Sequence, residues 1–125
     1  GEGSAGADAL VFIEVAGLSF RRLGVQEKYR LREACARDFA SVAGASLGTV
    51  RDLELRTGTV SLSGEQETTV IFLITAPSGT SVNGLALLFS RQSTHDSILQ
   101  TIRDAVGGSG AVHGSLAVRE AFVEP

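Results

Sequence analysis

The order of hydrophobic patterns along the 125 residues is the feature that most constrains the fold. Some stretches are rich in apolar and β-branched residues at strand-like spacing, and others place apolar residues three and four apart, as a helix packed on one side does. The strand-like stretches are 10–15, 49–62, 67–75 and 115–123, and the helical ones are 25–42, 82–89 and 98–106. Counting the last two helical stretches as one crossover, the order is strand, helix, strand, strand, helix, strand.

That order is the split βαβ, or ferredoxin-like, arrangement of α+β proteins. Two right-handed crossovers and one hairpin predict a four-stranded antiparallel sheet, with the first and third strands central and two helices on one face. The hairpin turn is predicted at Ser63–Gln66. Residues 9–124 form a single domain in this interpretation, and residues 1–8, mainly small and acidic, form a disordered linker.

Composition excludes several classes of function. The formal net charge of -3 offers no basic surface for nucleic acid. Cys35, the one cysteine of the chain, excludes an internal disulfide and any multi-cysteine metal site. The longest apolar run, 70–74, is far shorter than the roughly 20 residues of a membrane span. No cofactor or metal is therefore expected, and the lack of methionine suggests one domain of a larger protein whose compartment stays open.

The two central strands are predicted to be apolar on both faces. Val11 and Ile13 alternate with Leu10 and Phe12 in the first strand. In the third strand Val70, Phe72 and Ile74 lie opposite Ile71 and Leu73. One helix layer covers one face only. Either the linker, the hairpin or the C-terminal tail folds over the second face, or that face packs against a second copy or a neighbouring domain.

The second strand changes phase along its length. Leu53 and Leu55 point to one side, whereas Val60 and Leu62 are out of step with them. One residue of slip must be absorbed between the pairs, and glycine within a strand commonly marks a bulge or bend. Gly58–Thr59 is the predicted bend, unless the chain already turns there and the hairpin is longer.

Little in the sequence points to catalysis. His95 and His113 are the two imidazoles and lack metal-ligand spacing, while Cys35 falls on the apolar stripe of the first helix. Glu65 and Glu67 flank the hairpin turn, where carboxylates usually keep an edge soluble. No catalytic residue is predicted. A small dimeric α+β enzyme or ligand-binding domain, using the second sheet face as a pocket and His95 or His113 as a base, is an alternative.

Three segments resemble the SEA domain, and more closely the SEA-like βαββαβ repeat units of large kinetoplastid surface and flagellum-associated proteins. They are Val11-Phe-Ile-Glu-Val-Ala-Gly17, the helix Leu31-Arg-Glu-Ala-Cys-Ala-Arg-Asp-Phe-Ala40, and Gly58-Thr-Val-Ser-Leu62. Some SEA domains cleave themselves between Gly and Ser of a Gly-Ser-Val-Val-Val motif. The resemblance thus implies an extracellular domain in which Thr59 would attack the carbonyl of Gly58, although threonine replaces the serine.

Together these features predict a non-enzymatic structural module of a larger protein. Its partner is expected to be a protein, either a second copy or a neighbouring domain, contacted through the sheet face that carries Phe12, Ile71 and Leu73.

Overall fold

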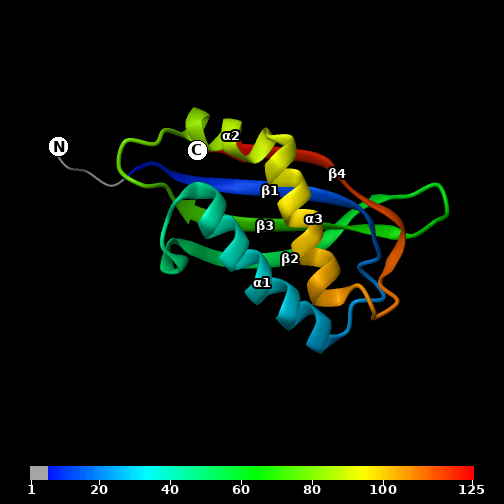
Figure 1. Cartoon of the computed structure of the whole chain (residues 1–125). Helices are drawn as coiled ribbons and strands as arrows, with labels where there is room; N and C mark the ends of the chain where they lie inside the picture. The colour runs from blue at the N-terminus through cyan, green and yellow to red at the C-terminus, as the bar shows by residue number, and fades with distance from the viewer. Residues whose placement is uncertain (1–5) are drawn as a thin grey trace.

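The computed structural model describes residues 6–125, so part of the predicted linker lies outside the described residues. The described chain forms four strands, three α-helices and a short 3-10 turn, η1 (Figure 1). In chain order they are β1 (Asp8–Leu18), α1 (Val25–Ala43), η1 (Leu47–Thr49), β2 (Val50–Val60), β3 (Gln66–Thr75), α2 (Val82–Ser90), α3 (Gln92–Val106) and β4 (Val112–Glu124).

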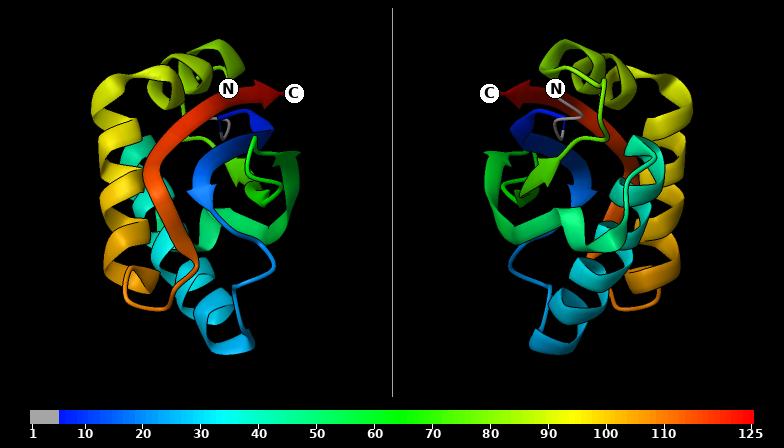
Figure 2. Two further views of the ribbon diagram at one scale, coloured as in Figure 1. Left: turned by 90° about the vertical axis from the view of Figure 1, so that its right-hand side faces the viewer. Right: turned by 90° about the vertical axis from the view of Figure 1, so that its left-hand side faces the viewer.

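The strands form one sheet in the order β2-β3-β1-β4, and each neighbouring pair is antiparallel. This confirms the predicted α+β fold with β1 and β3 central. All helices of the described chain lie on one face of the sheet (Figure 2). They number three instead of the predicted two, because the extended backbone of Arg91 (φ -69°, ψ 143°) separates α2 from α3 within the second crossover.

The core lies between these helices and the sheet. Phe72 of β3 stacks on Phe39 of α1 with ring centroids 4.3 Å apart, and Phe89 of α2 meets both rings edge-on. Val11 and Ile13 of β1 are fully buried beside them. Burying this many large side chains supplies the main driving force for folding.

The ends of α1 follow from its sequence. Glu27 accepts a hydrogen bond from the backbone N–H of Gly24 at the start, and Gly44 adopts the left-handed conformation that ends the helix. α3 starts at Gln92, before the predicted helical stretch 98–106. Its N-cap is Arg91, and the Thr94 hydroxyl donates to the carbonyl of Leu88.

The N-terminal boundary of the domain lies earlier than predicted. The backbone of Ala7 accepts a hydrogen bond from Ala76 and donates one to Thr80, and Asp8 already belongs to β1. These two residues are therefore part of the fold and not of a linker, because their backbone groups are paired with the segment after β3.

β1 also continues past residue 15, where the predicted strand ends. Gly17 has a φ of +86°, and the pairing of β1 with β4 shifts register beside it. A Cβ at this position would lie 2.5 Å from the carbonyl oxygen of Ser115. Glycine here forms a bulge that lets β4 approach closely, and the strand resumes at Leu18.

None of the helices in the described part is long and apolar enough to cross a bilayer.

Candidate functional site

The sheet face opposite the helices, called here the helix-free face, is the main candidate surface. Cross-strand register aligns its side chains in three successive rows that run from β2 through β3 and β1 to β4. In that order the rows are Arg51, Leu73, Leu10, Glu124; then Glu54, Ile71, Phe12, Phe122; then Arg56, Thr69, Glu14, Glu120.

The predicted residues Phe12, Ile71 and Leu73 all lie on this face, in adjacent rows. Phe12 and Leu73 are half-buried, whereas Ile71 is only 7% exposed. Phe122, which sequence reasoning did not single out, stacks on Phe12 with centroids 4.7 Å apart and is 43% exposed. The sequence carried a signal for it, because successive residues of a strand point to opposite faces of the sheet. Ala121 and Val123 point toward the helices, so Phe122 between them points to the helix-free face.

Charged side chains flank this apolar centre. Arg51 donates to the Thr75 hydroxyl at 2.9 Å and lies 3.5 Å from Asp8, and Arg56 pairs with Glu54 at 2.6 Å. These groups are exposed, so each pair stabilises the fold little. An apolar centre with a polar rim is therefore the layout of the face.

The predicted bend Gly58–Thr59 lies next to this face. The register of β2 with β3 shifts between Thr57 and Val60, so that β2 carries an additional residue there. The hydroxyl and the backbone N–H of Thr59 both donate to the Glu14 carboxylate. The hydroxyl hydrogen bond holds the pKa of Glu14 below its ordinary value. Gly58 is not among the described glycines with positive φ.

A second shift of β2, between Arg51 and Glu54, was not predicted. Asp52 takes a φ of +52° there, the one described residue other than glycine with positive φ. Aspartate tolerates this conformation better than most residues, but no pattern in the sequence distinguishes it from an ordinary strand residue.

A recess of about 510 Å³ opens beside the bulge of β1, between the β2–β3 hairpin and the start of β4. Glu67 lies in its wall with a side chain that is only 2% exposed. One carboxylate oxygen is 3.0 Å from His113 Nε2, and the other accepts the Gly17 N–H at 2.7 Å and lies 3.7 Å from the guanidinium of Arg119. The expectation that Glu67 is an exposed turn carboxylate was wrong, because β1 and β4 supply it with partners.

Glu65, two residues before Glu67, is partly buried, with 20% of its side-chain surface exposed. It accepts a hydrogen bond from the Ser19 hydroxyl at 2.8 Å and pairs with Arg22 at 2.8 Å. The Ser19 hydrogen bond lowers the pKa of Glu65 from its ordinary value. Its role is to tie the turn to the segment after β1.

The two histidines do not lie together. His95 is on α3, where its Nε2 lies 2.8 Å from the carbonyl oxygen of Phe89, within the helix layer. His113, in contrast, lines the recess. Of the two bases considered from the sequence, His113 alone borders a cavity that also contains a second titratable group.

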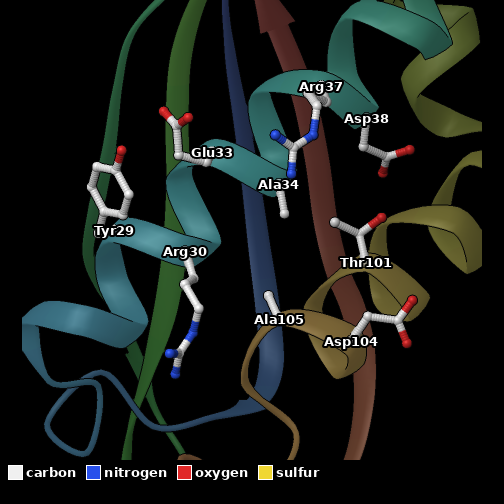
Figure 3. Close-up of a pocket in the computed structure, with 9 residues that line it drawn as sticks. All are labelled: Tyr29, Arg30, Glu33, Ala34, Arg37, Asp38, Thr101, Asp104 and Ala105. Carbon is white, nitrogen blue, oxygen red and sulfur yellow. The ribbon is translucent and has the colours of Figure 1, made fainter.

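A shallow groove of about 700 Å³ runs between α1 and α3 (Figure 3). It carries both signs of charge, with Arg30 and Arg37 from α1 and Asp104 from α3. Asp38 accepts a hydrogen bond from Ser97 through one oxygen, and its other oxygen is buried without a hydrogen-bond partner among the described residues. The mixed charges favour no ligand class.

Within the described residues, no three histidine, cysteine, aspartate or glutamate side chains are grouped as a metal site requires. Comparison of the chain with protein-family models, with curated proteins and with solved structures gave no match.

Proposed function

We propose that the chain is a non-enzymatic protein-interaction module that binds a protein partner through the helix-free face. The observation that carries this proposal is the apolar centre of that face, where Phe122 stacks on Phe12 beside Leu10 and Leu73, on the side of the sheet that the described helices leave uncovered. Burying these half-exposed groups against a partner is favourable at roughly 25 cal/mol per Å².

The layout of the face also fits the anatomy of protein interfaces. Such interfaces have an apolar, aromatic centre and a charged, hydrated rim. Here the aromatic pair lies in the middle row, and Arg51 and Arg56 lie at the β2 edge, with Glu120 and Glu124 at the β4 edge. A binding surface for a small ligand needs a concave cavity, and neither the groove between α1 and α3 nor the recess beside the β1 bulge is lined by the apolar residues at the centre of this face.

Site-specific photo-crosslinking tests this proposal in the cells that make the protein. A photoreactive residue at Phe122 is expected to form crosslinks to protein, and mass spectrometry of the linked peptides identifies which protein. The matched control is the same residue at Arg103, which is exposed on α3. If position 122 gives no more protein crosslinks than position 103, the proposal is overturned.

A second candidate is a ligand-binding or acid–base site in the recess. The observation in its favour is the pairing of His113 with the buried carboxylate of Glu67 at the wall of a cavity, since such pairs occur at functional sites. A library of small polar compounds should then shift the side-chain NMR signals of His113 but not those of His95. Absence of any compound that shifts His113 would remove this candidate.

A further inference from the structure

We infer that the occupant of the helix-free face is a second copy of this chain, packed sheet to sheet about a two-fold axis that runs parallel to the strands. This inference rests on the proposed function, since it names the partner for the same face. The observation behind it is the sign of the charges at the two edges of the sheet.

The two outer rows have a basic end and an acidic end. Arg51 and Arg56 lie at the β2 edge, and Glu124 and Glu120 lie at the opposite ends of the same rows, on β4. β2 and β4 are the two edge strands of the sheet. At the β2 edge the two arginines outnumber one glutamate, Glu54 of the middle row, and the β4 edge carries two glutamates. The side chains between the edges are apolar in the first two rows, whereas the third row has Thr69 and Glu14 there.

A two-fold axis parallel to the strands places the edge with the arginines of one copy over the edge with the glutamates of the other. It sets β2 of one copy over β4 of the other while each row stays at the same height. Arg51 then faces the partner subunit's Glu124, and Arg56 faces the partner subunit's Glu120. Each contact occurs twice, as in every isologous interface. Between them β3 of one copy lies over β1 of the other, so Leu10 faces the partner subunit's Leu73 and Phe12 faces the partner subunit's Ile71.

The other two-fold arrangement is disfavoured by the same charges. An axis across the strands sets β2 over β2, so that Arg51 and Arg56 face the arginines of the second copy, and the glutamates of β4 likewise face each other. Juxtaposed like charges oppose association. The edge charges therefore select one of the two symmetric packings.

The present partners of the arginines do not prevent this packing. Arg56 pairs with Glu54, and Arg51 lies 3.5 Å from Asp8, but these groups are exposed and such pairs contribute little. A guanidinium has five N–H donors, enough to keep one neighbour and reach a second carboxylate.

The size of the face sets the expected affinity. The strip from Asp8 to Glu14 is about 20 Å long, and four strands are about 19 Å wide. Both copies together would bury roughly 800 Å², which is below the roughly 1,200 Å² of stable specific interfaces and within the range of weak, transient ones. The dimer is thus expected to be weak and concentration-dependent, with a dissociation constant in the range of roughly 10 µM to 1 mM.

Sedimentation velocity of the chain from about 5 µM to about 1 mM tests the inference with two double variants. Arg51→Glu/Arg56→Glu makes both edges acidic, and Glu120→Arg/Glu124→Arg makes both edges basic. We expect each variant alone to raise the dissociation constant at least about tenfold, because like charges then meet. An equimolar mixture of the two should associate, since each edge again faces its opposite.

Circular dichroism and thermal unfolding first establish that both variants fold, which is expected because all four side chains are exposed. A wild-type chain that stays monomeric throughout the concentration range overturns the inference. So does a dimer that neither variant weakens, or a mixture that fails to associate. Crosslinks from position 122 to a different protein would then retain the proposed function while the second copy is ruled out.

Discussion

His113 Nε2 lies 3.0 Å from Glu67 Oε1, although 46 residues separate the two along the chain. The other oxygen of the same carboxylate accepts the Gly17 N–H at the bulge of β1. A single side chain thus connects β3 to both strands of the β1–β4 pair, at the point where that pairing changes register.

Removing the Glu67 carboxylate should destabilise the fold. Glu67→Ala leaves the Gly17 N–H without its acceptor in a buried position and removes the partner of His113, so we expect a loss of about 3 kcal/mol. Glu67→Gln keeps an acceptor of the same shape and should cost about half as much. Urea unfolding at pH 7 measures both changes.

Glu54→Ala is the matched control, because Glu54 is an exposed carboxylate of the neighbouring strand paired only at the surface. Its effect should stay within about 0.5 kcal/mol. Equal losses for Glu67→Ala and Glu54→Ala would contradict a structural role for the buried carboxylate.

The bulge glycine provides a second test of the same region. Gly17→Ala adds a Cβ at positive φ and within 2.5 Å of the Ser115 carbonyl oxygen, so backbone must move. We expect a loss of more than about 2 kcal/mol. Gly44→Ala is the control, since Gly44 also has positive φ but open space around its Cβ position, and about 1 kcal/mol is expected there. Thermal unfolding of the two variants compares them, and a loss for Gly17→Ala no larger than that for Gly44→Ala would argue against the close approach.

The elements with strong local patterns are those that the sequence predicted well. The stripe of Leu31, Cys35 and Phe39 with glycines at both ends defines α1, and the strand order follows from the handedness of the crossovers. The phase change of β2 likewise pointed to a shift of register near Gly58. These signals lie within a few residues of the feature that they predict.

What the sequence did not predict depends on contacts between distant segments. Glu67 resembles any carboxylate beside a turn until Gly17, His113 and Arg119 surround it. The first strand was predicted to end at residue 15, two residues before Gly17, because a bulge glycine and a terminating glycine have the same local signal. The charge pattern of the helix-free face also required the register, because Arg51 and Glu124 share a row only once the strands are aligned.

The hydrogen bond from Thr59 to Glu14 makes the stability of the fold depend on pH in the acid range. The Thr59 hydroxyl holds the pKa of Glu14 below its ordinary value of 4.5. A carboxyl whose folded pKa lies below its unfolded value adds stability above the unfolded pKa, and that stability is lost as the pH falls through the folded pKa. We therefore expect the Thr59→Ala variant to have a lower free energy of unfolding than wild type at pH 7. Between pH 5 and pH 3 its free energy of unfolding should fall by less than that of wild type. Denaturant unfolding at both pH values checks this, and parallel pH profiles for the two proteins would contradict it.

Self-cleavage between Gly58 and Thr59, which the SEA resemblance implies, is expected not to occur. Gly58 lacks the positive φ at which backbone strain would be stored, and the Thr59 hydroxyl donates to the Glu14 carboxylate. Denaturing mass spectrometry after days at pH 7 should show the full-length mass of 13.0 kDa alone. Two fragments ending and starting at this bond, absent from Thr59→Ala, would instead support cleavage.

Cys35 should be inert in the folded protein. Burial within the α1 stripe, with a smaller contribution from the charge of Asp38, raises the pKa of its thiol to about 12. The reactive thiolate is therefore scarce at pH 8, and reagents cannot reach it. We expect iodoacetamide to label the native chain at least about 100-fold more slowly than the chain in concentrated urea, because labelling then requires unfolding. Ser41→Cys, exposed on the same helix, is the control and should be labelled rapidly in the native state. Fast native labelling of Cys35 would mean that α1 separates from the sheet far more often than a core helix does.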